Sequence, residues 1–382
     1  MQITLMAIGS RGDVQPLIAL GVGLRKAGNQ VHIIAGDEFE GLIKGANLEF
    51  IPLGINIQSA MESHTSIFRF MESIKDQVLK ACKIEQDAII STFLGVSTCQ
   101  LARARGIPFF YVLPMPSLQT CEFPNPLFPD IPFGKRYNAL TYRLADRHIT
   151  RSFGDAGCLF QEPRPTYLCC FSPHVISRPS DWGDYAHVTG YWFLDHSINW
   201  QPKDELDAFI QKGPPPIYVG FGSTLTGEPE KMTRLVIDSL ASIKQRSVLV
   251  TGWGGLKVGE VYPDVYVVDS IPFDWLFPRV SVAVHHGGAG TTSAALRAGV
   301  PSVIVPFGVD QSFWARKMKN LGVATEPISP RRLTAKRLSA AIHTVIEDNQ
   351  MRENVSALGA KIRGEDGVGN AIAIIEQVMS GW

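Results

Sequence analysis

The chain has 382 residues, of which 45% are hydrophobic and 19% charged, and its 36 basic residues balance 36 acidic ones. This length exceeds one ordinary hydrophobic core and predicts two domains of roughly 150 to 200 residues each. A net charge of zero argues against a nucleic-acid partner, which normally requires a basic face.

Six cysteines are scattered along the chain, and no pair has the CxxC spacing. We therefore expect free thiols, as in a reducing cytoplasm. The first residues have no basic leader and only a short apolar run, so no secretory signal is expected. No window offers the roughly 20 apolar residues that a spanning helix needs. We expect a soluble cytoplasmic protein that could still touch a membrane surface.

In the first half of the chain, short apolar runs alternate with segments of helical spacing. The strands expected there are 3–8, 31–35, 48–52, 88–90 and 109–113, and the helices are 16–26, 38–45, 67–86 and 96–105. Residues 114–132, rich in proline and phenylalanine, break the alternation, and loops of such length are usually functional. Alternating strands and helices predict a parallel sheet covered on both faces.

A polar segment that ends in three prolines, 197–216, predicts a linker, after which the alternation restarts. The later strands expected are 217–221, 248–251, 265–268, 280–285 and 303–306, and the helices are 230–244, 291–298, 311–320, 335–347 and 370–379. We expect an N-terminal domain over 1–196, a C-terminal domain over 217–365, and a last helix within 366–382 that could pack back on the first domain. This is an α/β fold of two Rossmann-like doubly wound domains facing a cleft, where ligands bind at the carboxyl ends of strands.

The sequence HHGGAGTT, residues 285–292, follows an apolar strand and opens a helix. Glycines allow close approach to an anion, and a helix start offers unpaired amides and a favourable dipole. A purely structural turn would explain one glycine pair, but this combination favours a diphosphate site. His286 can donate to a phosphate oxygen, whereas His285, at the last strand position, is expected to be buried.

A hydride-transfer enzyme would instead have GxGxxG after the first strand, with an acidic residue about 20 residues further on. The first strand here ends in GSRGDVQP, which lacks that spacing, and a P-loop lysine is also missing. An NAD-dependent oxidoreductase is therefore the weaker alternative.

Polar residues follow three other strands. Asp13 lies near the start of the first helix, where it is either a helix cap or a general base for an acceptor hydroxyl. Arg11 could meet a phosphate or a sugar hydroxyl. Asp310 and Gln311 could bracket sugar hydroxyls or merely cap a helix. Ser223, in the sequence GFGS, could offer a hydroxyl to a diphosphate.

Taken together, these motifs resemble the GT-B inverting glycosyltransferases, and among them the sterol glucosyltransferases and related bacterial antibiotic glycosyltransferases. The likeness is carried by GSRGDVQPLIALGVGLRKAG (9–28), PSDWGDYAHVTGYWFLD (179–195), GWGGL (252–256), and the long donor signature over 271–311. Between 142 and 173 the chain is shorter than in sterol glucosyltransferases and matches poorly, which leaves the acceptor open.

The resemblance implies UDP-glucose as co-substrate, no cofactor, and inversion at the anomeric carbon without a metal, and the sequence has no DxD motif. It implies a role for His286 at the diphosphate with the amides of Ala289, Gly290 and Thr291, for Asp310 and Gln311 at the sugar, for Ser270 and Ile271 beside the uracil, and for Ser10, Arg11 and Asp13 as N-terminal contacts. Asp13 takes the position of the base. Trp275 is expected to serve packing.

The expected reaction transfers glucose to a hydroxyl of a hydrophobic small-molecule acceptor, such as a sterol or another lipid-like alcohol, with peripheral membrane contact left open. Asp13 would accept the proton, His286 and the helix amides would stabilise the departing UDP, and Ser223 and Arg11 would assist. Closure about the 197–216 linker would exclude water. The alternatives are a natural-product aglycone as acceptor, a UDP-sugar epimerase or hydrolase, and a non-catalytic sugar-nucleotide-binding protein.

Overall fold

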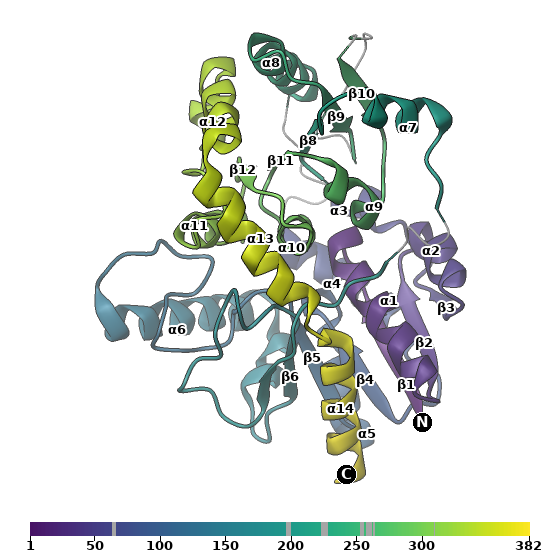
Figure 1. The fold of residues 1–382 in the computed structure, drawn as a ribbon. Helices are drawn as coiled ribbons and strands as arrows, with labels where there is room; N and C mark the ends of the chain where they lie inside the picture. Colours follow the sequence, from purple (N-terminus) through teal and green to yellow (C-terminus); the bar gives the residue numbers. More distant parts are fainter. Residues whose placement is uncertain are drawn as a thin grey trace. The chain divides into compact units, whose positions relative to one another are not determined.

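A computed structural model of the chain describes residues 1–62, 66–195, 200–222, 228–252, 256, 262, 264–308 and 310–382. The chain divides into two compact units. The N-terminal unit comprises Met1–Leu194 together with Glu365–Trp382, and the C-terminal unit comprises Asp195–Gly364. Each unit has its own sheet with helices packed around it (Figure 1).

The described residues of the N-terminal unit form a seven-stranded sheet in the order β3-β2-β1-β4-β5-β6-β7, and all neighbouring strands are parallel. The strands are β1 (Gln2–Ala7), β2 (Gln30–Ala35), β3 (Glu49–Pro52), β4 (Ala88–Ser91), β5 (Phe109–Leu113), β6 (Thr166–Cys169) and β7 (Ala186–Val188). The central strand β1 is an almost unbroken apolar run, and Ile3, Leu5 and Met6 are fully buried. Such a run is typical of a strand that is covered on both faces.

The helices of this unit are α1 (Arg11–Lys26), α2 (Glu40–Gly45), α3 (Ile57–Glu62), α4 (Ile67–Ala81), α5 (Thr98–Arg105), α6 (Gly134–Ser152) and α14 (Gly367–Ser380), with short 3-10 turns η1 (Asp37–Phe39), η2 (Phe93–Gly95) and η3 (Gly154–Phe160). Helix α14 packs closely on α1, because a β-carbon at Gly23 would lie 2.5 Å from Val368 Cγ1. The side-chain amide of Asn370 also donates to the carbonyl of Thr189 at 2.9 Å. The last helix of the chain is thus part of the N-terminal unit.

The described residues of the C-terminal unit form a five-stranded parallel sheet in the order β10-β9-β8-β11-β12. Its strands are β8 (Ile217–Gly220), β9 (Ser247–Val250), β10 (Val265–Val268), β11 (Val282–His285) and β12 (Ser302–Ile304). Its helices are α7 (Asp204–Gln211), α8 (Pro229–Ser242), α9 (Phe273–Leu276), α10 (Ala289–Ala298), α11 (Gln311–Asn320), α12 (Ala335–Glu347) and α13 (Asn349–Arg363), with 3-10 turns η4 (Phe277–Arg279) and η5 (Pro330–Arg332).

Alternate residues of the central strands of this sheet face two different cores. Val219 and Val284 belong to one cluster of buried apolar side chains, whereas Tyr218 and Ala283 belong to another. Because side chains alternate along a strand, this split shows that both faces of the sheet are covered. The two α/β units with parallel sheets confirm the predicted fold class.

The segment expected as a linker, 197–216, is more structured than a spacer. Residues 196–199 lie outside the described part, but α7 occupies the middle of the segment. Leu206 is buried in the C-terminal unit, and Phe209 and Ile210 pack against the same cluster. The spacing of these three residues is that of an amphipathic helix, a pattern that the flanking prolines obscured.

Other differences from the sequence-based elements occur in both units, and in the C-terminal unit α13 was not predicted. Helix α1 begins at Arg11 rather than at Pro16, and α4 ends at Ala81 rather than near residue 86. The strands β6 and β7 and the long helix α6 were not predicted. Among the helices that the structure describes, none combines the length and the apolar character that crossing a bilayer requires.

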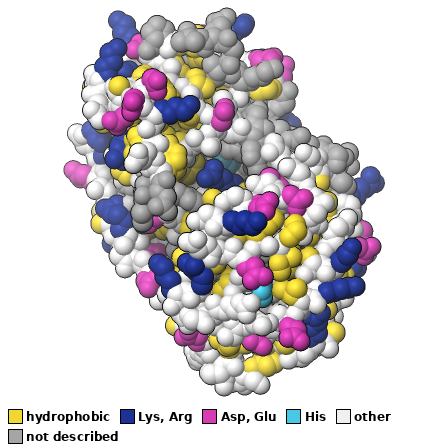
Figure 2. All heavy atoms as spheres, turned by 90° about the vertical axis from the view of Figure 1, so that its right-hand side faces the viewer, with side chains coloured by type: hydrophobic (Ala, Val, Ile, Leu, Met, Phe, Trp, Pro, Cys, Tyr) yellow, Lys and Arg dark blue, Asp and Glu magenta, His cyan; other side chains and the backbone are white. Residues whose placement is uncertain are grey.

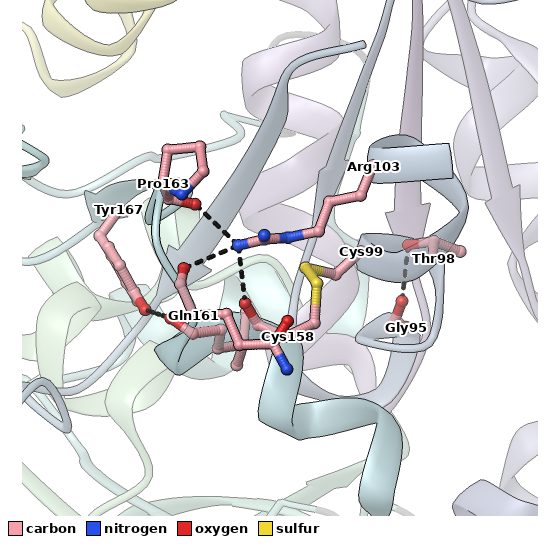
Figure 3. The surroundings of a disulfide bond; sticks show 9 residues. Gly95, Thr98, Cys99, Arg103, Cys158, Gln161, Pro163 and Tyr167 are labelled. Carbon is pink, nitrogen blue, oxygen red and sulfur yellow. Dashed lines mark hydrogen bonds between the residues drawn. A yellow bond between two sulfur atoms is a disulfide. The ribbon is translucent and has the colours of Figure 1, made fainter. Parts of the chain in front are cut away.

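A disulfide bond corrects the prediction of six free thiols. Cys99 of α5 is bonded to Cys158 of η3 across 59 positions of sequence, while Cys82, Cys121, Cys169 and Cys170 are free (Figure 3). Sequence spacing alone gave no sign of this pairing, because it depends on how α5 and η3 pack. The expectation of a reducing compartment rested on free thiols and loses that support.

The same region contains a dense set of hydrogen bonds. The guanidinium of Arg103, one turn after Cys99, donates to the carbonyls of Gln161 and Pro163, each at 2.7 Å, and to that of Cys158 at 3.2 Å (Figure 3). These bonds fasten the turn between η3 and β6 to α5. The stretch 142–173, for which the sequence resemblance was poor, is therefore an ordered part of the N-terminal unit.

Candidate functional site

The site in the C-terminal unit is built at one edge of its sheet. All five strands are parallel, so the turns that follow β8, β10, β11 and β12 leave the sheet at the same, carboxyl edge. Ligands of open α/β sheets bind at this edge. The sequence-predicted residues His286, Asp310 and Ser270 lie in three of these turns.

The turn HHGGAGTT joins β11 to α10. His285 is the last residue of β11 and is fully buried, as expected. Gly287 then adopts a positive φ of 88°, a conformation that side chains rarely tolerate. A β-carbon at Gly287 would also lie 2.8 Å from Ile304 Cγ2, so both the backbone angle and the packing require glycine.

Both histidines of the turn are neutral at physiological pH. Burial, with a smaller contribution from His286, lowers the pKa of His285 to about 3. Nδ1 of His285 accepts a hydrogen bond from the backbone N–H of Gly287 at 3.1 Å. Burial lowers the pKa of His286 to about 4. A neutral imidazole still donates one N–H, so His286 can bind a phosphate oxygen without carrying charge.

The ring of His286 lies between two glycines. A β-carbon at Gly288 would lie 2.4 Å from His286 Nε2, and one at Gly222, in the turn after β8, would lie 2.8 Å from His286 Cε1. Nδ1 of His286 is buried without a hydrogen-bond partner among the described residues. Packing against the two glycines thus orients the ring, and one of its nitrogens retains unused hydrogen-bonding capacity. Leaving such a buried nitrogen unsatisfied costs free energy.

Helix α10 directs its N-terminus to the same turn. Gly288 is the N-cap residue in an extended conformation and provides no side-chain cap, so Ala289, Gly290 and Thr291 form an uncapped first turn. The first amides of a helix have no intrahelical partner and carry partial positive charge. These amides and His286 together form a set of donors suited to an anion such as a diphosphate.

Asp310 and Gln311 follow β12, whose last residues pair with the end of β11. The indole Nε1 of Trp314 donates to Asp310 Oδ2 at 2.9 Å, which fixes the carboxylate. Gln311 Oε1 accepts from the backbone N–H groups of Phe307 at 2.8 Å and Gly308 at 3.3 Å. These bonds order the loop before α11 and orient the amide of Gln311.

The Asp310-Gln311 pair lies close to the HHGGAGTT turn. A β-carbon at Gly287 would be 3.1 Å from the backbone oxygen of Gln311. The structure therefore brings together two segments that the sequence separates by more than 20 positions.

Ser270 and Ile271 follow β10 at the same edge of the sheet. Ser270 is exposed, whereas the side chain of Ile271 is buried in the core, so only its backbone is placed to meet a ligand. Trp275 belongs to the same core and stacks under the Arg279 guanidinium, 4.6 Å from the ring centroid, which confirms its expected packing role. Ser223 lies outside the described residues.

The N-terminal unit presents a second turn, between β1 and α1. Ser10 precedes α1, and Arg11 and Asp13 lie in its first turn, with Arg11 exposed and Asp13 partly buried. Asp13 Oδ2 accepts from the backbone N–H of Ser10 at 2.8 Å and from its hydroxyl at 2.9 Å. The carboxylate of Asp13 thus takes part in capping the N-terminus of α1, as the capping interpretation requires.

The surroundings of Asp13 also favour a proton acceptor. Burial raises the pKa of Asp13, and the two hydrogen bonds from Ser10 partly oppose that increase. Gly9, with a φ of 134°, leaves room for the carboxylate, because a β-carbon there would lie 2.5 Å from Asp13 Oδ2. A raised pKa makes a carboxylate a stronger base, so capping and catalysis are compatible roles here.

Sequence reasoning missed the residues that position this site. Gly222, Gly288 and Trp314 hold His286 and Asp310 in place. Gly222 and Gly288 are visible in the motifs GFGS and HHGG, but their contact with one imidazole requires the strand order. Trp314 follows Asp310 by four positions, a helical spacing that could have suggested the contact.

Two family models match the chain. Residues 3–107 match the glycosyltransferase family 28 N-terminal domain, and residues 234–366 match the erythromycin biosynthesis protein CIII-like, C-terminal domain. These matches cover both turns described above.

Two solved structures with the same fold are those of glycosyltransferases. The spinosyn forosaminyltransferase SpnP aligns with a TM-score of 0.73 over 100% of this chain and 99% of its own, at 16% identity. The glycosyltransferase VinC, solved in complex with dTDP, aligns with a TM-score of 0.71 over 100% of both chains, at 19% identity. The fold of this chain is therefore the GT-B fold.

Among curated relatives, a sterol 3-beta-glucosyltransferase of Arabidopsis thaliana is 34% identical over 97% of this chain and 64% of its own length. A second one from the same plant is 32% identical over 97% of this chain and 67% of its own length. The enzyme of Pichia angusta is 34% identical, and the chain spans 33% of it. The chain belongs to the glycosyltransferase family that contains these sterol 3-beta-glucosyltransferases.

Proposed function

We propose that this protein transfers glucose from UDP-glucose to a hydroxyl group of a hydrophobic acceptor such as a sterol. The observation that carries the proposal is the neutral His286 beside the uncapped start of α10, at the same sheet edge as Asp310 and Gln311. Donors for a diphosphate and polar groups for a sugar are the two recognition elements of a nucleotide sugar.

The donor would bind along the carboxyl edge of the C-terminal sheet. Its diphosphate would accept hydrogen bonds from His286 and the amides of Ala289, Gly290 and Thr291. Its sugar hydroxyls would meet Asp310 and Gln311, and its uracil would lie beside Ser270 and Ile271. The dTDP complex of VinC, a protein of the same fold, supports a nucleoside diphosphate here. The choice of glucose follows the names of the sterol glucosyltransferase relatives.

The reaction would be a single displacement with inversion. The acceptor oxygen forms a bond to the anomeric carbon while the bond from that carbon to the diphosphate oxygen breaks, and the hydroxyl proton passes to the Asp13 carboxylate. Negative charge grows on the departing UDP, where preorganised donors stabilise it. Arg11 and Ser223 would assist by further contacts with the donor.

We propose that this charge is met by protein donors without a metal ion. The helix amides and the imidazole of His286 supply partial positive charge where the leaving group departs. Among the described residues, no group of three or more His, Cys, Asp or Glu side chains could hold a metal ion. Activity in the presence of a chelator would support this, and restoration of lost activity by a divalent cation would contradict it.

A sterol is the first acceptor to test, because the curated relatives named above are sterol 3-beta-glucosyltransferases. The second candidate is a natural-product aglycone, favoured by the match of residues 234–366 to an erythromycin biosynthesis protein. The acceptor would contact the N-terminal unit, which includes β6 and the turn before it that Arg103 fastens.

An acceptor screen tests the proposal. The full chain would be incubated with UDP-glucose and sterols, hopanoids, carotenoid alcohols or polyketides, and products would be read by mass. A product heavier than its acceptor by one hexosyl group, with release of UDP, is expected. Conversion or hydrolysis of UDP-glucose without an acceptor would instead indicate an epimerase or hydrolase. Binding of UDP-glucose with no product would indicate a non-catalytic binding protein.

A further inference from the structure

The helix α6 and the loop before it carry an unusual concentration of exposed apolar side chains. Of eight large hydrophobic residues that are exposed in the described part of the chain, four lie between positions 127 and 144. They are Leu127 (49% exposed), Phe133 (71%), Leu140 (50%) and Leu144 (47%). Four exposed apolar side chains within one helix and the loop before it favour an interaction surface over singly scattered residues.

Basic side chains surround these apolar ones. The exposed cations of α6 are Lys135, Arg136, Arg143, Arg147 and Arg151, and Asp146, which is partly buried, is the one acidic residue of the helix. Arg136, Arg143, Arg147 and Arg151 are separated by seven, four and four positions, and Leu140 and Leu144 lie at helical spacings between them, so all six share one side of the helix. None of the five cations forms an ion pair with another described residue.

The opposite side of α6 is fixed to the protein by polar contacts. Asn138, Thr141 and Tyr142 are buried. Asn138 Nδ2 donates to the carbonyl of Cys121 at 2.9 Å, and the Tyr142 hydroxyl donates to that of Pro116 at 3.1 Å. The inner side of this helix is thus partly polar, while its outer side displays two leucines among four arginines.

The turn that carries Phe133, directly before α6, is also held in place. The ring of Phe133 packs edge-on against Tyr137, with centroids 5.7 Å apart, and the Tyr137 hydroxyl donates to the carbonyl of Pro129 at 2.8 Å. Phe133 is therefore presented by an ordered turn and not by a loose loop.

We propose that the α6 face, defined as Leu127, Phe133 and the exposed side chains of α6, docks the N-terminal unit on an anionic lipid bilayer. Its cations complement lipid phosphates, and its apolar side chains can enter the boundary between headgroups and acyl chains. Long arginine stems cover apolar surface while their charged ends reach the headgroups. The chain as a whole has zero net charge, and acidic and basic side chains are interspersed on the face drawn in Figure 2. The exposed acidic and basic residues of α6 are all basic, and this excess of positive charge is therefore a local feature.

This inference deepens the proposed function, because a sterol-like acceptor resides in a membrane, but docking itself can be measured without any reaction. The full chain would be sedimented with vesicles of phosphatidylcholine alone and of phosphatidylcholine mixed with phosphatidylserine. The test variants are R143Q/R147Q and L140S/L144S. The matched control, R25Q/K26Q, removes two exposed cations from the end of α1, so the net charge equals that of R143Q/R147Q.

We expect the wild type and the R25Q/K26Q control to bind anionic vesicles, and to bind neutral ones weakly. Loss of two cations from the α6 face should lower partitioning by roughly 25-fold, since each basic residue near an anionic surface contributes about fivefold. L140S/L144S should also lower it. Equal binding to both vesicle types, or equal binding by R143Q/R147Q and the control, would overturn the proposal. The proposal would also be overturned if L140S/L144S bound vesicles like the wild type but had a lower molar mass than the wild type by light scattering. That result would show that the α6 face joins two copies of the chain.

Activity separates this proposal from the proposed function. With an acceptor delivered in cyclodextrin, R143Q/R147Q should turn over like the wild type, whereas with acceptor in anionic vesicles its turnover should fall in parallel with binding. Equal loss in both assays would overturn the docking role. If the wild type binds anionic vesicles as predicted but glucosylates no acceptor, the proposed reaction is refuted. The docking role of the α6 face would still be supported.

Discussion

The imidazole of His286 occupies space that any side chain at Gly288 would fill, because a β-carbon at Gly288 would lie 2.4 Å from His286 Nε2. On its other side, Gly222 leaves a similar space for the ring. The glycines of HHGG thus do more than allow a tight turn. They fix the position of the histidine that is proposed to bind the diphosphate.

Replacing Gly288 by alanine should therefore displace His286 and weaken UDP binding. Because a charge-assisted hydrogen bond contributes about 1.5 to 3 kcal/mol, we expect a loss of roughly tenfold or more in affinity. Gly41→Ala is the matched control, since nothing lies within 4 Å of its added β-carbon. Calorimetric titration with UDP measures the effect. Equal affinities for UDP in the two variants would show that the ring does not need this space.

Asp13→Asn should retain UDP-glucose binding and lose most turnover. The amide keeps the size of the side chain but cannot accept the acceptor's proton, and general-base catalysis is worth roughly a hundredfold to ten-thousandfold in rate. Asp76→Asn, at an exposed position on α4, is the control. Turnover of Asp13→Asn close to that of the wild type would remove Asp13 from the base role.

Ser10→Ala should move the acidic limb of the pH–rate profile to higher pH. A base must be deprotonated, so activity rises with pH through the pKa of Asp13. Burial raises that pKa above its usual value, and hydrogen bonds from Ser10 hold it down. Loss of the hydroxyl that donates to Asp13 Oδ2 at 2.9 Å removes part of this opposing effect. The profile of kcat against pH would show it, and a limb that stays in place or moves to lower pH would speak against Asp13 as the titrating group.

The fold should lose stability in mild acid, in part because of His285. Its pKa is about 3 in the fold, since burial disfavours the charged ring, and about 6.5 in an unfolded chain. The unfolded state therefore binds the extra proton first, and stability falls as pH drops below about 6.5, by up to roughly 1.4 kcal/mol per pH unit from this residue. Urea unfolding of the C-terminal unit in the intact chain, at neutral pH and at pH about 5, measures the slope. His285→Gln should flatten it, and an identical slope in that variant would contradict the assignment.

Much of the fold and the donor site could be predicted because the signals are local. The buried strands are continuous apolar runs, and HHGGAGTT contains its own strand end, turn and helix start. Helix α6 was missed for a physical reason. Its inner side carries Asn138 and Thr141 and its outer side Leu140 and Leu144, so these residues blur the apolar stripe that indicates a helix.

Non-local contacts account for the rest. The bond between Cys99 and Cys158 depends on the packing of α5 against η3, and the space for His286 depends on Gly222, which lies in the turn after β8 and is distant in sequence. The start of α1 was placed at Pro16, although Ser10 and Asp13 form the true helix start. The reciprocal Ser10–Asp13 contacts extend the helix beyond the apolar spacing that indicated its start.

The central claim is that His286 binds the diphosphate of a nucleotide sugar, and calorimetric titration of His286→Ala with UDP tests it most directly. The control is His343→Ala, at an exposed position on α12. We predict that the control binds UDP like the wild type, while His286→Ala binds it roughly tenfold or more weakly, as expected for loss of a hydrogen bond to a charged group. Unchanged UDP affinity in His286→Ala would contradict the diphosphate assignment and, with it, the proposed donor site.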